Sequence, residues 1–235
     1  MYVLAFDTAT DVVTVAIGHG DEPLGALQLT SGRAHAERLV PAIERLAADT
    51  GVELGRLAAI AVGVGPGRFT GLRVGVTTAK VMAQALRIPV VGIGTLDLIA
   101  YPLRYARRDV VAAVDARRRE VFWARYHTVP GGLERVGREA VDPPHEVVAE
   151  LEATGAEVLL AGDGAHRYRD RFAAVEHVEL AGAEFSAPSA LALLELARGR
   201  LEREEFVAAS ELTPRYLRES DAAISWERAT LRSPS

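Results

Sequence analysis

The chain has 235 residues, 49% of them hydrophobic, and its formal net charge at pH 7 is −5. This length suffices for one large or two small domains with a full core, and the acidic balance excludes a protein that holds nucleic acid with a basic surface overall. The absence of cysteine excludes disulfides and thiolate chemistry. We expect a cytoplasmic location without membrane attachment, because no signal peptide opens the chain and no apolar run reaches the roughly 18 residues of a span.

The amino-terminal part of the chain predicts a β-meander. Apolar runs at 2–6, 12–18 and 24–30 alternate with polar turns. Asp7 and Thr8 stand at the first turn, where the actin-like and sugar-kinase-like ATPases present a carboxylate near a metal-bound phosphate. Asp and Thr are also ordinary turn residues, so both interpretations stay open.

An amphipathic helix is predicted over residues 35–49, and Gly51 ends it. Leu39 belongs to its apolar face, and His35 begins it. No second metal ligand stands one turn after His35, since position 39 is leucine. Capping or an interface is therefore the favoured role for His35.

The central stretch of the chain predicts a strand, a glycine-rich loop and a helix. The strand covers 60–64, and the helix 70–86. Between them, Gly65 and Gly67 offer amide groups to an anion at the start of the helix. The loop matches neither the Walker pattern nor the dinucleotide pattern, so phosphate binding remains one alternative.

Small residues form a stripe on this second helix, because they recur every four positions: Gly71, Gly75, Ala79 and Ala83. Such a face lets another backbone approach closely. It predicts either packing on the chain's own sheet or a helix-to-helix subunit interface, with Leu72, Arg73, Val76, Lys80 and Met82 beside the seam. In the second case, Gly75→Arg would block the partner and leave the fold nearly intact.

The second half of the chain repeats the pattern of the first. A strand at 89–93 and a helix at 96–101 precede it, and strands at 110–114 and 121–126 then flank a charged turn. Asp115 stands in this hairpin where Asp7 stands in the first, which indicates two similar lobes. We expect lobes at 1–103 and 104–219 and a flexible tail at 220–235, with helices at 143–151 and 189–204 and a strand at 157–161.

Several motifs together resemble the bacterial TsaB (YeaZ) family. They are DTAT at 7–10, RAHAERLVP at 33–41, GVGPGRFTGLRVG at 63–75, DAR at 115–117 and PRYLR at 214–218. The resemblance implies an α/β protein with the actin-like ATPase (ASKHA) fold, built of two similar βββαβα-type lobes of which the second is reduced. It also implies a non-catalytic subunit that binds and activates TsaD, the enzyme that transfers threonylcarbamoyl to adenosine 37 of tRNAs reading ANN codons.

The same resemblance implies partners and site residues. TsaD would pair with the two helices of the first lobe, and TsaE would be the third protein of the complex. A homodimer would form when TsaD is absent. This chain would meet tRNA through the complex. The candidates for contact with tRNA at the rim of the protein are Arg104, Arg107, Arg108 and residues 117–119. The predicted partner interface comprises His35, Leu39, Gly71, Leu72, Arg73, Gly75, Val76, Ala79, Met82 and Ala83.

No metal site is expected. The catalytic relative has a His-x-x-x-His motif in the region where this chain carries only Thr95 and Asp97 among apolar residues, which is too few ligands. No cofactor is expected to bind tightly to this chain, and ATP or ADP would bind within the complex. The residues that would lie near a nucleotide are Asp7, Thr8, Gly65, Gly67 and Asp115.

The enzyme alternative is a small actin-like ATPase or kinase acting on a small molecule. It would use Asp7 near a metal, Gly65 and Gly67 near phosphate, and 162–164 near adenosine. A metallopeptidase is a weaker alternative, because the metal ligands are missing.

Overall fold

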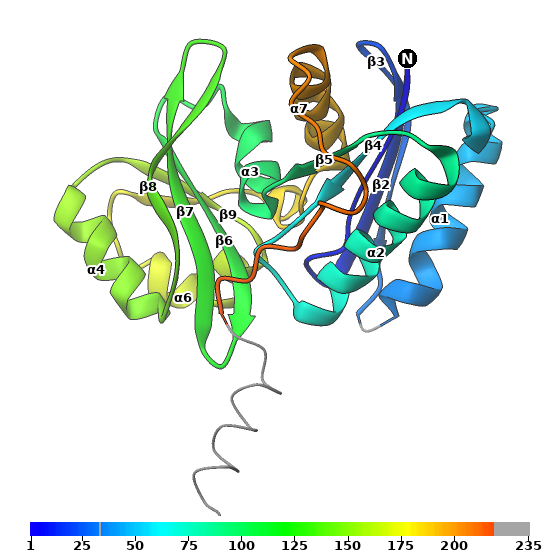
Figure 1. Ribbon diagram of the computed structural model, residues 1–235. Coiled ribbons are helices and arrows are strands. Elements are labelled where there is room, and N and C mark those ends of the chain that lie inside the picture. Colours follow the sequence, from blue (N-terminus) through cyan, green and yellow to red (C-terminus); the bar gives the residue numbers. More distant parts are fainter. Residues whose placement is uncertain (33, 219–235) are drawn as a thin grey trace, which may run out of the picture.

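The computed structural model describes residues 1–32 and 34–218, which form two lobes, each built on a five-stranded sheet (Figure 1). The first sheet has the order β3-β2-β1-β4-β5 and the second the order β10-β9-β6-β7-β8. The first sheet contains β1 (Tyr2–Asp7), β2 (Val12–His19), β3 (Glu22–Thr30), β4 (Leu57–Gly63) and β5 (Val90–Ile93). The second contains β6 (Asp109–Arg117), β7 (Glu120–Val129), β8 (Gly132–Asp142), β9 (Val158–Ala161) and β10 (Val178–Leu180).

The two sheets have the same topology. In each, three successive strands pair antiparallel and the first of them also pairs parallel with the fourth, β1 with β4 and β6 with β9. The fifth strand is parallel to the fourth in both lobes. The predicted internal repeat and the α/β class with two similar lobes are therefore confirmed.

Helices cover the sheets as the βαβ crossovers require. They are α1 (His35–Thr50), α2 (Phe69–Leu86), α3 (Thr95–Ala100), α4 (Pro144–Thr154), α5 (Asp163–Arg167), α6 (Arg169–Phe172) and α7 (Ala190–Glu202), with single 3₁₀ turns at Leu54–Arg56, Tyr101–Leu103 and Ala183–Phe185. Gly51 ends α1 in the left-handed conformation, as its position after the apolar pattern predicts. Both α1 and α2 lie on one face of the first sheet and contact each other (Figure 1).

The central strands of the first sheet are buried on both faces. Leu4 and Phe6 of β1 point into the core shared with α1 and α2, whereas Val3 and Ala5 point to the opposite side, toward α3 and α7. A strand between two helical layers needs apolar side chains in both directions, which explains why this strand reads as a continuous hydrophobic run.

The prediction that all of residues 104–219 form the second lobe needs a correction, because the end of the described chain returns to the first lobe. Leu193 and Ala197 of α7 pack against β1, and Leu212 enters the core of α1 and α2. Val207 also bridges to Val90 of β5. The predicted tail at 220–235 lies outside the described residues.

The small-residue stripe of α2 lies against the chain's own sheet. A Cβ atom added at Gly71 would stand 2.0 Å from the carbonyl oxygen of Thr8, and one added at Gly75 would stand 2.4 Å from its Oγ1. The hydroxyl of Thr8 donates a hydrogen bond to the Gly71 carbonyl at 2.7 Å. Ala79 and Ala83 continue the contact as core residues. Of the two interpretations of the stripe, the structure supports the intramolecular one.

This burial corrects most of the predicted partner interface. The stripe is inside the lobe, and so are Leu72 and Val76 of α2 and His35 and Leu39 of α1. Of the predicted residues, only Arg73 is exposed, and Met82 is partly exposed. The expectation that Gly75→Arg would leave the fold nearly intact is also wrong, because no side chain fits between α2 and Thr8.

We predict that Gly71→Ala destabilises the protein although alanine favours a helix. The new methyl group must displace the backbone of Thr8, and such overpacking costs about 2–3 kcal/mol of the free energy of unfolding. Urea unfolding at neutral pH measures the change. Gly199→Ala in α7 is the matched control, because its nearest neighbour there is a flexible arginine side chain at 3.4 Å, and it should gain up to about 1 kcal/mol. Equal effects of the two substitutions would contradict the close approach.

Candidate functional site

Asp7 lies at the end of β1 and is fully buried. Its Oδ1 accepts a hydrogen bond from the amide of Ala9 at 2.7 Å, and its Oδ2 accepts one from the Thr95 hydroxyl at 2.9 Å. Gly63 lies so close to the carboxyl group that a Cβ atom at this position would overlap the group. Burial raises the pKa of Asp7 to about 6, and the hydrogen bonds only partly oppose this. One oxygen of this carboxylate therefore holds the turn between β1 and β2, and the other ties that turn to the start of α3.

The rest of that turn is held by residues predicted for other roles. The Nε2 atom of His35 lies 2.6 Å from the carbonyl oxygen of Thr10, to which a protonated Nε2 donates. Thr8 is buried under α2, as described above. These contacts give His35 a structural role at the first hairpin, rather than a place on an exposed interface.

The glycine-rich loop packs on the chain itself. A Cβ at Gly67 would lie 2.5 Å from the carbonyl oxygen of Ala9, and one at Gly65 would lie 2.9 Å from the carbonyl oxygen of Arg215. The amide of Arg68 donates to Ala9, and the Gly65 carbonyl accepts from Thr95. The structure thus brings Gly65, Gly67 and Asp7 into one region, where their close contacts are with protein atoms.

Asp115 holds the equivalent place at the end of β6. Its side chain is 3% exposed and lies 3.4 Å from Nη1 of Arg117 and 3.6 Å from Nε of Arg167. Its amide donates to Asp163, whose pKa is raised chiefly by burial. The second hairpin therefore repeats the buried carboxylate of the first but surrounds it with arginines.

Ion pairs connect the two hairpins across the junction of the lobes. Arg68, at the start of α2, pairs with Asp11 of the first turn, and Arg117 of the second lobe lies 3.6 Å from the same carboxylate. Burial, followed by the nearby charge of Arg117, lowers the pKa of Arg68. Asp11, Arg68 and Arg117 all line the cleft between the lobes.

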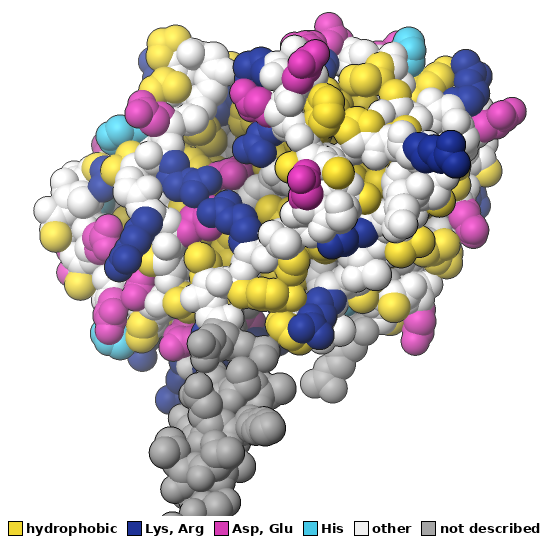
Figure 2. Space-filling view, viewed as in Figure 1, with side chains coloured by type: hydrophobic (Ala, Val, Ile, Leu, Met, Phe, Trp, Pro, Cys, Tyr) yellow, Lys and Arg dark blue, Asp and Glu magenta, His cyan; other side chains and the backbone are white. Residues whose placement is uncertain are grey.

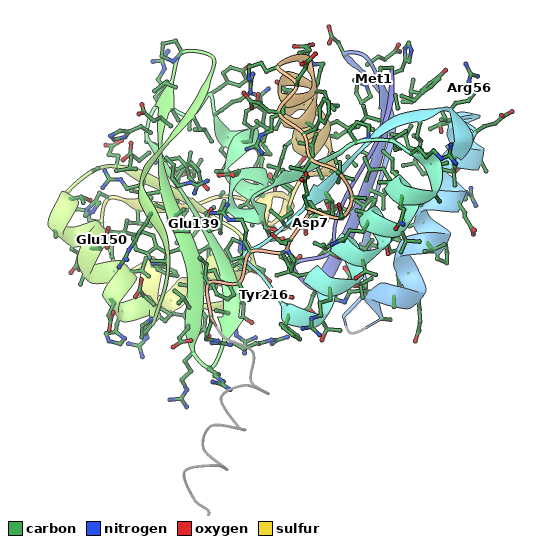
Figure 3. The ribbon with its side chains drawn as sticks, viewed as in Figure 1. Met1, Asp7, Arg56, Glu139, Glu150 and Tyr216 are labelled. Carbon is green, nitrogen blue, oxygen red and sulfur yellow. The ribbon has the colours of Figure 1, made fainter. Side chains whose placement is uncertain are left out.

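The segment after α7 crosses from the first lobe to the second at the same place (Figures 1 and 3). The amide of Arg215 donates to the Val64 carbonyl at 2.7 Å, and its guanidinium pairs with Glu139 of β8 at 2.9 Å. The ring of Tyr216 lies 5.2 Å from that of Phe69. Arg218 ends the crossing, where it pairs with Glu120 at 2.6 Å. We call residues 212–218 the strap.

The cleft between the lobes has a volume of about 1020 Å³ and is lined by both hairpins, the start of α2 and the strap. Its charged side chains are mostly paired with one another, so few of them are left to bind a phosphate. Among residues 1–32 and 34–218, no group of three His, Asp or Glu side chains could hold a metal ion. The sequence interpretation missed Arg68, Asp11 and Glu139, because ion pairs between distant segments leave no local pattern.

The outward face of α2 carries no acidic residue. The helix contains no Asp or Glu, and Val81 is 61% exposed on it. Lys80 donates to the carbonyls of Ser210 and Leu212, and Arg73 stacks on Phe69 with its guanidinium 3.9 Å from the ring centroid. The neighbouring α1 adds Val40, which is 45% exposed. Figure 2 shows this part of the surface as mostly white and yellow, with few acidic side chains.

None of the helices in the described part of the chain is both long enough and apolar enough to cross a membrane.

We predict that Asp7 makes stability fall as the pH rises. Between about pH 4 and pH 6 the folded chain holds a proton on Asp7 that the unfolded chain has lost, so deprotonation favours unfolding. Compared with Asp7→Asn, the native chain should lose on the order of 3 kcal/mol more between pH 4 and pH 7, measured by urea unfolding. Asp170→Asn, at an exposed position, should follow the native chain. Parallel curves for the native chain and Asp7→Asn would contradict the buried, protonated carboxyl group.

A family model described as TsaD, tRNA N6-adenosine threonylcarbamoyltransferase, matches residues 27–226. The tRNA threonylcarbamoyladenosine biosynthesis protein TsaB of Haemophilus influenzae is 31% identical over 241 residues, which cover 96% of this chain and 96% of that protein. The structure of YeaZ from Pseudomonas aeruginosa superposes with a TM-score of 0.79 at 35% identity, and covers 92% of this chain and 99% of that one.

A more distant structure supports the fold alone. The activator of the 2-hydroxyisocaproyl-CoA dehydratase from Clostridium difficile superposes with a TM-score of 0.52 at 12% identity, and covers 87% of this chain and 97% of that one. The predicted actin-like ATPase (ASKHA) fold is thus confirmed. The match of the family model and the identity across nearly the whole chain show that this chain belongs to the TsaB (YeaZ) family of tRNA threonylcarbamoyladenosine biosynthesis proteins.

Proposed function

We propose that this chain is a non-catalytic subunit that binds and activates TsaD, and that it docks through the outward faces of α1 and α2. The complex would transfer threonylcarbamoyl to adenosine 37 of tRNAs reading ANN codons, with TsaE as its third protein. The observation that carries the proposal is the exposed face of α2, which lacks carboxylates and centres on Val81. Exposed apolar residues on a helix face without carboxylates are typical of a protein interface.

The docking face differs from the one that the small-residue stripe suggested. The stripe fixes α2 on its own sheet, so the opposite side of the helix must face outward. Val74, Thr77, Val81 and Ala85 follow one another at spacings of three or four positions on that side. Because a face of this kind can also pair with its own copy, we propose a homodimer through it when TsaD is absent.

A nucleotide is proposed to bind within the complex rather than tightly to this chain. The support is the pairing inside the cleft, where Arg68 and Arg117 share Asp11 and the strap covers Gly65. An incoming phosphate would have to replace these ion pairs. Calorimetric titration of the isolated chain with ATP and Mg²⁺ tests this, and micromolar affinity would favour the small-molecule kinase instead.

We predict that Val81→Arg prevents docking and leaves the fold unchanged. The residue is 61% exposed in the single chain, but in the complex an arginine there would be buried without a partner. The dissociation constant for TsaD should rise about thirtyfold or more, which is the effect of losing about 2 kcal/mol at the centre of an interface. Calorimetry with TsaD, and sedimentation of the chain alone for the homodimer, provide the measurements.

Leu191→Arg is the matched control. Leu191 is a 47% exposed apolar residue on α7, a different helix of the same lobe, so this substitution should leave the affinity for TsaD unchanged. If both variants bind like the native chain, docking does not use α2. If both lose affinity equally, the effect is one of added charge rather than of a specific face.

Reconstitution tests the activating role itself. tRNA, TsaD, TsaE, ATP and the enzyme that supplies the activated threonyl precursor are combined with and without this chain. Modified adenosine should form only when this chain is added, and the chain alone should form none. Formation that does not depend on this chain would contradict the proposal.

A further inference from the structure

The tip of the β6–β7 hairpin is made of arginines in a conformation that side chains usually avoid. Arg117, Arg118 and Arg119 have φ angles of 62°, 52° and 65°, in the left-handed region. Arg117 pairs with Glu120 across the hairpin, which leaves Arg118 and Arg119 as its two-residue turn. Asn-Gly is favoured in such turns, because positive φ strains a residue with a Cβ atom. The presence of arginine at these strained positions indicates that its positive charge has a functional role at the tip of the hairpin.

The tip lines a groove on the second lobe. The groove has a volume of about 860 Å³ and runs between the hairpin, the start of α4 and the helices α5 and α6. In Figure 1 the hairpin projects from the lobe beside these helices. Its basic and aromatic lining residues are Arg117, Arg118, Arg119, His145, Arg167, Tyr168 and Arg171.

The groove is strongly cationic although the chain as a whole has a net charge of −5. Its one acidic lining residue, Glu120, is paired with Arg218. Asp115 lies beneath Arg117 and Arg167 and is 3% exposed. Within residues 1–32 and 34–218, the side chains of Arg119 and Arg171 are both exposed and have no ion-pair or hydrogen-bond partner. At least two guanidinium groups are therefore available to an anion.

An aromatic side chain completes the groove. Tyr168 is partly exposed between α5 and α6, and the guanidinium of Arg167 lies 5.9 Å from the centre of its ring. Guanidinium forks match phosphate oxygens, and tyrosine rings stack on unpaired bases. Clustered arginines beside an aromatic ring are therefore suited to a nucleic acid strand with accessible bases.

We propose that this groove binds the phosphate backbone of a single-stranded or looped segment of RNA, with an unpaired base stacked on Tyr168. Because the choice of tRNA as that RNA rests on the proposed function, the groove would hold the substrate tRNA of the complex. This groove reduces the number of arginines that remain candidates for contact with tRNA. Arg104 and Arg108 are held by Glu195 and Glu179, whereas the arginines of the hairpin tip lie in the groove.

The test is the binding of fluorescently labelled tRNA to the full chain, followed by anisotropy over a series of salt concentrations. The double variant Arg119→Gln/Arg171→Gln removes the two available guanidinium groups. It should weaken binding about tenfold at low salt and reduce the slope of log K against log salt by about 1.4, since each contact to single-stranded nucleic acid contributes about 0.7. Thermal unfolding should be unchanged, because both side chains are exposed.

Arg138→Gln is the control. Arg138 is exposed on β8 and does not line the groove. Its removal should leave both the affinity and the salt slope unchanged. An equal loss for the control and the double variant would show diffuse attraction, and an unchanged double variant or no binding by the native chain would overturn the proposal.

Two further arms identify the ligand. A fully paired RNA duplex should bind more weakly than the labelled tRNA, which has looped segments, because the bases of a duplex cannot stack on Tyr168. ATP at equal phosphate concentration should not release the RNA, and complete release would assign the groove to a free nucleotide. The assay contains no TsaD, so loss of docking in Val81→Arg and loss of RNA binding in the double variant are separate results.

Discussion

The contact between α2 and the end of β1 determines how the first lobe can be used. Gly71 and Gly75 let the helix lie on the backbone of Thr8, with a hydrogen bond from the Thr8 hydroxyl to the Gly71 carbonyl. Side chains on that face would force the helix away from the sheet. This approach also places Arg68 beside the first turn, where it pairs with Asp11. The orientation of α2, its outward face around Val81 and the ion pair between Arg68 and Asp11 all depend on it.

The two lobes share one topology but differ in the residues at the equivalent hairpins. In the first lobe, the carboxyl group of Asp7 is surrounded by backbone and a threonine, and its raised pKa shows that burial dominates. In the second, Asp115 supports Arg117 and Arg167. The same position therefore stabilises a turn in one lobe and holds positive charge at the surface in the other. The two hairpins are connected to each other by the ion pairs that Arg68 and Arg117 make with Asp11.

Local patterns in the sequence were sufficient to predict most strands and the two long helices of the first lobe. They also predicted the repeat, because apolar runs and turn residues act over a few positions. They missed β8, an edge strand whose charged residues include Glu134, Arg135 and Arg138 and whose pairing with β7 is interrupted by a bulge. They also assigned α7 to the second lobe, because its apolar face does not specify which sheet it covers.

The site was harder to predict than the fold, because its residues meet only in three dimensions. A stripe of small residues indicates close packing but not whether the neighbour is the same chain or another. Steric contact decided this case, since Thr8 leaves no room at Gly71 or Gly75 for a side chain or for a partner's helix. The surface left for partners is then the opposite side of α2 in the first lobe and the arginine groove in the second. Their chemistry differs, because the α2 face is partly apolar and lacks carboxylates whereas the groove is cationic, so a protein and an RNA could be held at the same time without competing for one face.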